Sequence, residues 1–399
     1  MAESEGLQLS GLFYLLLTIL QLLGKACNAQ ISSLNVGICS GLQQQQPLVP
    51  AFFLLGDSIL DPGNNNRFIT LAKVDHYPYG IDFPGNVPTG RFSNGYTAAD
   101  YLAFKLGLPL IPAYHNPSTR GKRLLKGVNF ASGGSGILPN TGKIYGEVES
   151  LEEQVQSLQA VKNEVTGVLG STAAADELFA SAAFMVVTGS NDWLLSFFNP
   201  ILPIRIADKT SSEHHRDTLI DTLLPQIEAM YEVGARKIVV AGLPALGCCP
   251  SQVMQFETNG SCVEHVNGVA KDYNQKLLPQ VVALNDRLAN ATIAYIDVYS
   301  LILKAAQNPS EFGFKTGNIA CCGIGKYKGF LTCLPGLQPC DIVEDHFYWD
   351  AYHPTQNFYP FLVDHIWNEG PPYSYPNSLQ KMFDKQGISQ ILGSSHTEL

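Results

Sequence analysis

The feature that most constrains this chain is a short apolar run that ends at a polar turn. Residues 52–55 have the length and the apolar character of a buried strand. Gly56-Asp57-Ser58 follows directly, and the turn-forming run Asp61-Pro62-Gly63-Asn64-Asn65-Asn66 comes soon after it. Open α/β sheets carry their chemistry beyond the carboxyl ends of parallel strands. The sequence therefore predicts that Ser58 lies at the functional edge of such a sheet.

Strand-like and helix-like patterns alternate along most of the chain. Strands are predicted at residues 52–55, 182–187, 237–241 and 293–298. Helices are predicted at residues 96–106, 151–169, 215–233, 263–288 and 355–367. Strands separated by helices of this length are typical of a parallel sheet with helices on both faces. We therefore predict a single-domain, three-layer α/β/α fold around a parallel central sheet.

The N-terminal residues have the pattern of a secretory signal peptide. Residues 12–23 form an apolar run that is too short to span a membrane, and small residues at Cys27-Asn28-Ala29 allow cleavage after Ala29. The leading segment carries Glu3 and Glu5 and no Lys or Arg, which departs from the usual basic start. An N-terminal anchor and a mitochondrial-type leader are the alternatives, and the acidic, arginine-free start disfavours the mitochondrial one.

Four parts of the chain are expected from these patterns. They are a signal peptide over residues 1–29, a loose leader over 30–48, one folded domain over 49–370 and a loose C-terminal tail over 371–399. No run after the signal peptide is long and apolar enough to span a membrane. We therefore expect a secreted, extracellular protein whose mature chain has no integral membrane segment.

Cysteines and glycosylation sequons agree with an oxidising, extracellular location. Eight cysteines follow the signal peptide, and an even number in a secreted chain predicts disulfides without fixing their pairing. They are Cys39, Cys248, Cys249, Cys262, Cys321, Cys322, Cys333 and Cys340. Zinc binding is the alternative, but no Cys-x-x-Cys occurs, so no metal is expected. Two sequons, at Asn259 and Asn290, predict N-glycosylation.

The charge of the chain limits its partners. The formal net charge is -10, from 25 basic and 35 acidic residues, and Lys and Arg form no long runs. Binding to nucleic acid or to an anionic membrane surface depends on clustered positive charge. An acidic chain without basic patches therefore argues against nucleic acid as a partner.

Further polar or glycine-rich clusters stand at residues 129–136, 188–192 and 350–353. Ser58, Asp350 and His353 are the residue types of a nucleophile, an orienting carboxylate and a general base. Taken singly, Asn191 and Asp350 could each cap a helix instead, and an isolated histidine is usually structural. The Gly133-Gly134-x-Gly136 run lacks the third glycine and the acidic residue of a dinucleotide-binding fingerprint, so no nucleotide cofactor is expected.

Taken together, these motifs resemble the SGNH-hydrolase superfamily, and specifically its plant GDSL esterase/lipase branch. The matching blocks are Phe53-Leu54-Leu55-Gly56-Asp57-Ser58 with Asp61-Pro62-Gly63-Asn64-Asn65-Asn66, Asn129-Phe130-Ala131-Ser132-Gly133-Gly134-Ser135-Gly136, Gly189-Ser190-Asn191-Asp192 and Asp350-Ala351-Tyr352-His353-Pro354. The segments around Cys248, Cys249 and Cys262 and at Cys321-Cys322-Gly323 also resemble that branch. The resemblance runs from about residue 50 to 370, and its one departure is Ile59 where the motif has leucine.

The resemblance implies an SGNH-type, flavodoxin-like hydrolase domain over residues 49–370 and a secreted serine esterase or lipase without cofactor. It assigns Ser58 as the nucleophile and Asp350 and His353 as its partners. It assigns the oxyanion hole to Ser58, Gly134 and Asn191. The G-x-S-x-G elbow of the other common serine hydrolases is absent from the chain.

Several alternatives stay open at the level of sequence. Gly133 is adjacent to Gly134 and is the other candidate for the oxyanion hole. An acyltransferase would share the same acyl-enzyme, whereas a catalytically inactive binding or defence protein would be expected to lack a triad residue, and none is missing. A metal-binding module is disfavoured by the cysteine spacing. The substrate is predicted only as a small-molecule, lipid or cell-wall ester, and the sequence predicts neither acyl length nor oligomeric state.

Overall fold

The computed structural model describes residues 46–199 and 210–384. Of these, the residues from Pro47 onwards belong to one compact unit. The predicted signal peptide over 1–29, most of the leader over 30–48, and Cys39 lie outside the described residues. Among the described helices, none is both long enough and apolar enough to cross a membrane.

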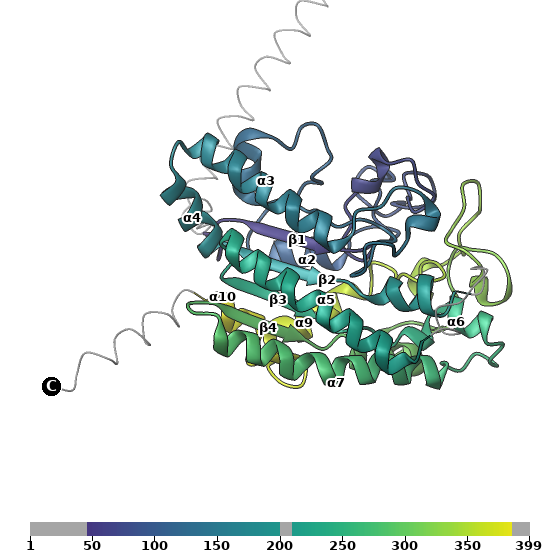
Figure 1. The fold of residues 1–399 in the computed structure, drawn as a ribbon. Coiled ribbons are helices and arrows are strands. Elements are labelled where there is room, and N and C mark those ends of the chain that lie inside the picture. Colours follow the sequence, from purple (N-terminus) through teal and green to yellow (C-terminus); the bar gives the residue numbers. More distant parts are fainter. Residues whose placement is uncertain (1–45, 200–209, 385–399) are drawn as a thin grey trace, which may run out of the picture. The chain divides into compact units, whose positions relative to one another are not determined.

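Five strands form one sheet in the order β1-β2-β3-β4-β5 (Figure 1). They are β1 (Phe52–Gly56), β2 (Ala183–Val187), β3 (Lys237–Ala241), β4 (Thr292–Ile296) and β5 (Ser374–Tyr375). The first four pair in parallel, and β5 pairs antiparallel with β4. All four predicted strands are confirmed within two residues at either end, and the antiparallel β5 is an addition that the sequence analysis missed.

A further extended segment, residues 128–132, runs parallel to β1 on the side away from β2. Leu54 N–H donates to the Val128 carbonyl (3.1 Å), Phe130 N–H donates to the Leu54 carbonyl (2.8 Å), and Ser132 N–H donates to the Gly56 carbonyl (2.9 Å). The spatial order is therefore this segment, β1, β2, β3, β4, which is the flavodoxin-like order. The order reverses at β1, and doubly wound sheets bind their ligands beyond the strand ends at such a point.

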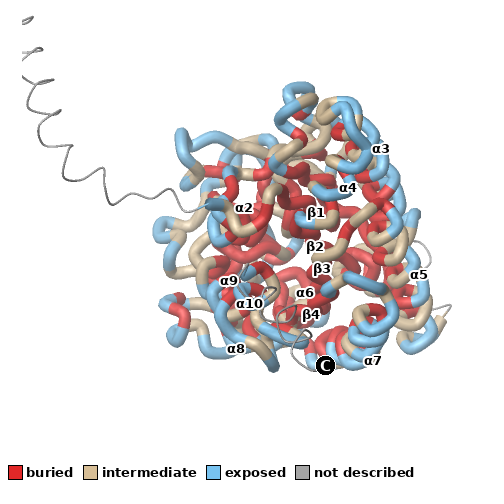
Figure 2. Tube along the Cα trace, turned by 90° about the vertical axis from the view of Figure 1, so that its left-hand side faces the viewer, coloured by how far each residue is buried: buried red, intermediate tan, exposed pale blue. Residues whose placement is uncertain are grey.

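Helices cover both faces of the sheet (Figures 1 and 2). One face carries α3 (Leu151–Leu169), α4 (Thr172–Ser181), α5 (Ser212–Val233) and α7 (Glu264–Arg287). The other carries α2 (Ala98–Lys105), α8 (Tyr299–Gln307), α9 (Tyr359–Asn368) and α10 (Leu379–Phe383). A short helix, α6 (Pro250–Gln255), lies in a loop after β3. The predicted three-layer α/β/α fold is confirmed, although α4, α6, α8 and α10 were not predicted.

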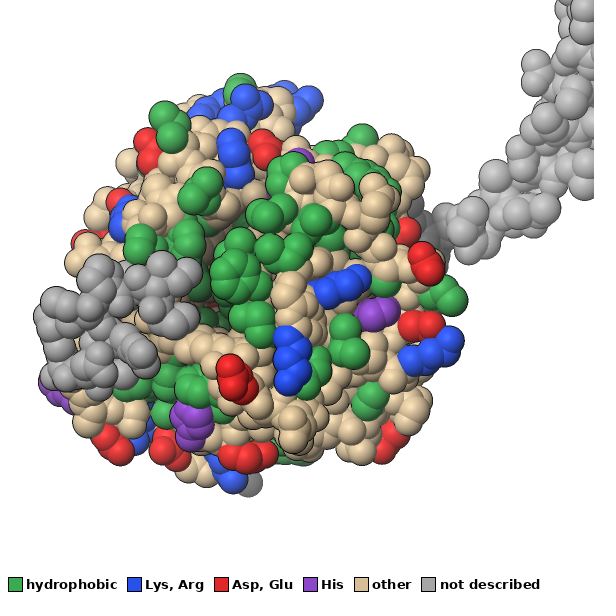
Figure 3. Space-filling view, turned by 90° about the vertical axis from the view of Figure 1, so that its right-hand side faces the viewer, with side chains coloured by type: hydrophobic (Ala, Val, Ile, Leu, Met, Phe, Trp, Pro, Cys, Tyr) green, Lys and Arg blue, Asp and Glu red, His purple; other side chains and the backbone are tan. Residues whose placement is uncertain are grey.

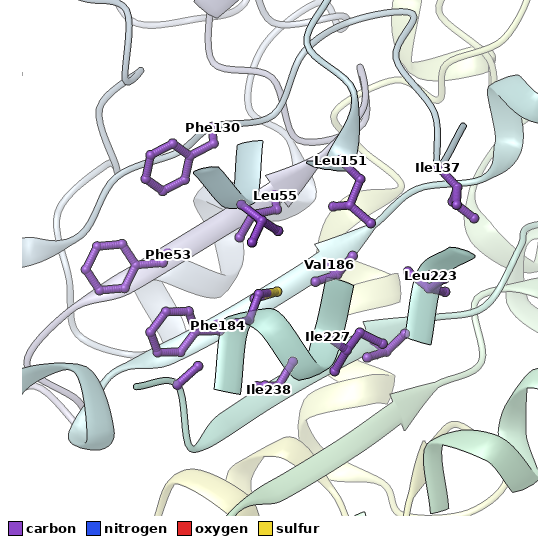
Figure 4. Packing of buried hydrophobic residues seen from close by; sticks show 14 of the residues in the cluster. Phe53, Leu55, Phe130, Ile137, Leu151, Phe184, Val186, Leu223, Ile227 and Ile238 are labelled. Carbon is purple, nitrogen blue, oxygen red and sulfur yellow. The ribbon is translucent and has the colours of Figure 1, made fainter. Parts of the chain in front are cut away.

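Alternate residues of each strand contribute side chains to two separate hydrophobic cores, because successive side chains of a strand point to opposite faces. Phe53 and Leu55 pack with α3, α4 and α5, whereas Phe52 and Leu54 pack with α2 and α9. Figure 4 shows the first of these cores, in which the rings of Phe53 and Phe184 stack with centroids 5.0 Å apart. Burial on both faces explains why the strands read as continuous apolar runs.

Helix boundaries follow capping signals in the sequence. A capping box formed by Ser150 and Glu153 begins α3, and Gly170, in the left-handed conformation, ends it. The predicted helix over 151–169 therefore has its predicted bounds. The helix predicted over 355–367 begins later, at Tyr359, with Pro360 in its first turn.

The prediction of a loose tail over 371–399 is wrong for residues 371–384. These residues form β5 and α10, and Phe383 stacks on Trp367 with centroids 6.1 Å apart. The Ser- and Pro-rich composition suggested a loose segment, but Leu379 and Phe383 stand four residues apart and are both buried on one helix face. At the other end, the last predicted leader residue, Leu48, donates its N–H to the Leu106 carbonyl (3.0 Å).

Three disulfides form among the described cysteines, which confirms the prediction of disulfide bonding. They join Cys248 to Cys262, Cys321 to Cys340 and Cys322 to Cys333. Cys249 is a buried free thiol. Both sequon asparagines, Asn259 and Asn290, are exposed, and their glycosylation stays a prediction.

Candidate active site

Three of the predicted site residues form one hydrogen-bonded series. Ser58 Oγ lies 2.7 Å from His353 Nε2, and His353 Nδ1 lies 2.8 Å from Asp350 Oδ1 and 2.9 Å from Oδ2. Asp350 is fully buried, and Ser58 and His353 keep only 7% and 5% of their surface exposed. With Nδ1–H donated to the carboxylate, Nε2 is left to accept the Ser58 O–H.

Asp350 and His353 come from one tight turn whose backbone the Asp350 carboxylate itself organises. Asp350 Oδ1 accepts the N–H groups of Tyr352 and His353, both at 2.9 Å. Trp349 N–H donates to the His353 carbonyl at 2.7 Å, closing the turn. Pro354 disfavours helical backbone angles at His353. The spacing of three residues thus places base and carboxylate side by side within one turn.

Tyr79 is a member of this series that the sequence analysis missed. Its hydroxyl donates to Asp350 Oδ2 at 2.6 Å and accepts the Cys333 N–H at 3.1 Å. The residue is fully buried, and burial together with the Asp350 charge raises the pKa of its hydroxyl well above the ordinary value, so the hydroxyl stays a donor. Nothing in the local sequence singles out Tyr79, since the contact spans 271 positions.

The Asp350 carboxylate is ionised at neutral pH despite its burial. Burial alone would raise its pKa, but the positive charge and the hydrogen bond of His353, with the hydrogen bonds of Tyr79 and of the Tyr352 N–H, outweigh it and lower the pKa. The carboxylate therefore keeps the charge with which it can hold an imidazole or stabilise an imidazolium.

Gly134 and Asn191, the other predicted site residues, line the same cavity as Ser58 and His353. Asn191 Nδ2 donates one of its two hydrogens to the Ser135 carbonyl at 2.8 Å, and its side chain makes no capping bond to the helix that follows. Gly134 adopts a φ of +79°, a conformation that favours glycine. Within the described part of the chain, the N–H groups of Ser58 and Gly134 donate to no other group.

Gly133, the alternative to Gly134, is already engaged. Its N–H donates to Asp61 Oδ2 at 3.0 Å. A Cβ at this position would approach the Phe92 ring to 2.5 Å, so the glycine is required by packing. Asn65 Nδ2 also binds the Gly133 carbonyl at 2.7 Å. Gly133 is thus held as part of the loop, and the free N–H belongs to its neighbour.

Two buried carboxylates hold the loop that carries Gly134. Asp61 receives the Gly133 N–H, and Asp192 receives the N–H groups of Ile137 (2.8 Å) and Leu138 (3.0 Å). Burial raises the pKa of Asp61 and of Asp192 to about 6 in each case. The sequence analysis recognised the run around Asp61 only as a turn and missed that it clamps the residues next to Gly134.

The cavity above the series has about 130 Å³ of free volume and a largely apolar wall. Its wall includes Leu71, Phe92, Leu194, Leu246 and Leu331. Figure 3 shows a face of the molecule that is hollowed near its middle, with hydrophobic side chains gathered along the border. An apolar pocket in which a few polar groups converge is the usual form of a small-molecule site.

The flavodoxin-like strand order, with a hydrogen-bonded Ser-His-Asp series at the point where that order reverses, is the arrangement of an SGNH-type hydrolase. The chain belongs to the family described as GDSL-like lipase/acylhydrolase, whose model matches residues 52–366. The sequence-based assignment to this family is therefore confirmed. Family membership identifies the protein as a hydrolase that acts on ester bonds.

Two relatives from Arabidopsis thaliana show how far the similarity extends. The chain is 38% identical to GDSL esterase/lipase 7 over 345 residues, which cover 85% of this chain and 93% of the relative. It is 37% identical to GDSL esterase/lipase At1g29670 over 341 residues, again covering 85% and 93%. The similarity therefore spans nearly the whole of both relatives.

Proposed function

We propose that the protein is a secreted serine esterase or lipase that hydrolyses carboxylic esters through an acyl-enzyme on Ser58. The observation that carries the proposal is the 2.7 Å contact between Ser58 Oγ and His353 Nε2, backed by the buried Asp350 carboxylate on the other ring nitrogen. A serine hydroxyl is a weak nucleophile unless an adjacent base takes its proton. The substrate is a small-molecule, lipid or cell-wall ester.

The reaction begins when Ser58 Oγ attacks the ester carbonyl while His353 Nε2 accepts the hydroxyl proton. The tetrahedral intermediate collapses as His353 returns that proton to the leaving alcohol, which leaves an ester between the acyl group and Ser58. A water molecule then attacks this ester while His353 takes one of its protons. Collapse of the second intermediate releases the carboxylic acid and restores the Ser58 hydroxyl.

The oxyanion is held by the N–H groups of Ser58 and Gly134 and by the second Nδ2 hydrogen of Asn191. Two observations support this assignment. The N–H groups of Ser58 and Gly134 donate to no other group among the described residues, whereas the Gly133 N–H already donates to Asp61. Donors that are fixed before the reaction stabilise the charge that develops in the transition state, and each is worth on the order of a hundredfold or more in turnover.

Asp350 orients the imidazole and stabilises the imidazolium that forms in each step. Its own position is held by the Tyr352 and His353 N–H groups and by the Tyr79 hydroxyl. The carboxylate therefore acts from a fixed, desolvated position, where its field on the ring is least screened.

Secretion is part of the proposal. It rests on the signal-peptide pattern of residues 12–23, on three disulfides of the kind found in oxidising compartments, and on the exposure of Asn259 and Asn290. Expression in a secretory host tests it. We expect an N-terminus near Gln30 and a gain in gel mobility after endoglycosidase treatment, whereas retention of residues 1–29 would contradict the proposal.

The catalytic proposal is tested with p-nitrophenyl esters of graded acyl length, with the Ser58→Ala protein as blank. We expect the wild-type protein to release p-nitrophenol and the Ser58→Ala variant to release it no faster than buffer alone. Ser58→Ala changes one oxygen, so its melting temperature serves as the control for folding. A variant that folds and keeps most of the activity would overturn the mechanism.

A further inference from the structure

A second cavity adjoins the candidate active site. It has about 50 Å³ of free volume, and Ile59, Ser190 and Pro244 form part of both its wall and that of the first cavity. Most of the rest of its wall comes from β2, from the end of β4 and from α2, α8 and α9, and loop residues such as Leu60 and Gly242 complete it. These elements belong to the core on the α2 and α9 face of the sheet.

The shared wall lies directly beside the reacting groups. Ile59 follows Ser58, Ser190 precedes Asn191, and Pro354, which lines the second cavity, follows His353. Each of the three segments that supply the candidate nucleophile, base and oxyanion donor therefore also supplies at least one wall residue of the second cavity. A substrate group bound to Ser58 has this cavity as its immediate neighbour.

The chemistry of the second cavity is that of an alkyl-binding site. Its wall holds no charged side chain and is formed mainly by aliphatic and aromatic residues, with hydroxyls only from Thr188, Ser190, Tyr359. Val187 ends the central strand β2 and still retains partial exposure, so this part of the core is open and not closed by packing. Apolar voids in proteins bind apolar guests in preference to water.

Volume sets what each cavity can hold. The first cavity, at about 130 Å³, is close in size to an engineered apolar cavity that accepts one benzene molecule. A straight acyl chain of about six carbons would fill it by that measure. The carbons of a longer chain need further apolar space next to the first cavity, and the second cavity offers such space.

We propose that the second cavity receives the distal carbons of the acyl chain, so that the substrates are esters of medium-chain aliphatic acids. This rests on the proposed function of Ser58 as the acylated residue. Each buried methylene raises affinity about fourfold. The enzyme therefore favours chains that reach the second cavity over an acetyl group, which cannot reach it.

Filling the cavity tests the proposal. Ala98 lines it, whereas its neighbour Ala99 is equally buried but does not, so Ala98→Leu and Ala99→Leu form a matched pair. We expect Ala98→Leu to lower the ratio of kcat/KM for p-nitrophenyl dodecanoate to that for p-nitrophenyl acetate by about tenfold or more, as for other changes of pocket volume by a few carbons. Ala99→Leu leaves that ratio at the wild-type value.

Enlarging the cavity tests the proposal in the opposite direction, with a substitution that does not overpack the core. Leu362 lines the cavity, and Val363, the next residue of α9, is also buried but lies outside its wall. We expect Leu362→Ala to move the preferred acyl length upwards and Val363→Ala to leave it unchanged, while both lower the melting temperature. A folded Leu362→Ala protein with the wild-type chain-length profile would overturn the proposal.

A binding measurement separates this proposal from the proposed function. Calorimetry with decanoate on the Ser58→Ala protein and on its Ala98→Leu double variant requires no catalysis. We expect the second substitution to weaken decanoate binding about tenfold or more, and equal binding would overturn the proposal. If the wild-type protein hydrolyses no ester but binds decanoate in this way, the hydrolase mechanism fails and the cavity assignment stands.

Discussion

The two halves of the candidate active site are built in opposite ways. Asp350 and His353 share one turn, and the carboxylate that faces the imidazole also accepts two N–H groups of that turn. Gly134 and Asn191 come from separate segments and are positioned by buried groups far along the chain, such as Asp61, which lies 72 positions from Gly133. One local turn, with a single long-range hydrogen bond from Tyr79 to Asp350, holds the base side, whereas long-range hydrogen bonds assemble the oxyanion side.

This difference predicts different consequences of mutation. On the base side, loss of His353 removes a reacting group and leaves the turn in place, because the Asp350 carboxylate holds the backbone of that turn. Changes on the oxyanion side alter the placement of donors as well as their number, and placement errors of about 1 Å cost on the order of a hundredfold in rate.

His353→Ala should lower kcat by about 10⁴-fold or more, because it removes the group that takes and returns the proton. Asp350→Ala should be milder in kcat but should lower the melting temperature more, since it removes the acceptor of two turn N–H groups. Steady-state kinetics and thermal melting on both variants check this. Equal melting temperatures would show that the carboxylate does not organise the turn.

Asn191→Asp should lower kcat by about a hundredfold with little change in KM, because an ionised carboxylate cannot donate to the oxyanion. Asp and Asn cap helices about equally well, so a capping role would leave both kcat and melting unchanged. Kinetics and melting of this one variant therefore distinguish the two functions of Asn191.

Tyr79→Phe should lower kcat by about tenfold without changing KM, because the Asp350 carboxylate loses one of the hydrogen bonds that fix its position against the imidazole. The hydroxyl now draws charge from Asp350. Without it, the carboxylate stabilises the imidazolium more strongly, so the pH at which activity is half lost on the acid side should move upwards. A pH–rate profile measures this shift, and a purely structural role for Tyr79 would leave the midpoint unchanged.

The smallest expected effect is on the pH dependence of stability. Burial raises the pKa of Asp61 and of Asp192 to about 6, so their stabilising contribution is complete below about pH 4 and is lost as pH rises through 6. Burial lowers the pKa of His215, which acts in the opposite direction over the same range. Asp192→Asn removes one of these titrating groups. The unfolding free energy at pH 8 minus that at pH 5 should therefore be less negative in this variant than in the wild type. An unchanged slope, measured by denaturant unfolding, would contradict the raised pKa.

The same contrast explains how much the sequence alone could predict. The three-layer fold was predictable because β1 to β4 are buried on both faces and read as apolar runs. The grouping of Ser58, Asp350 and His353 was predictable because each stands in a short motif whose spacing reflects a local turn, and their catalytic roles stay a prediction. Neither β5 nor α10 was predicted, since two buried apolar residues in a Ser- and Pro-rich segment give too weak a pattern.

Contacts between distant segments leave no comparable local pattern in the sequence. Tyr79 reaches Asp350 across 271 positions, and Asn65 reaches Gly133 across 68. The second cavity is formed by residues from β2, β4, α2, α8 and α9, whose side chains each look like ordinary core residues in the sequence. Such features follow from how the elements pack, and a single sequence does not specify that packing.

Labelling with a fluorophosphonate, followed by mass-spectrometric mapping, tests the central claim most directly. The probe reacts only with a serine whose hydroxyl is activated by a neighbouring base. We predict one labelled residue, Ser58, and loss of the label in the His353→Ala protein. Labelling of Ser135 or Ser190, or persistent labelling of Ser58 without His353, would contradict the proposed mechanism.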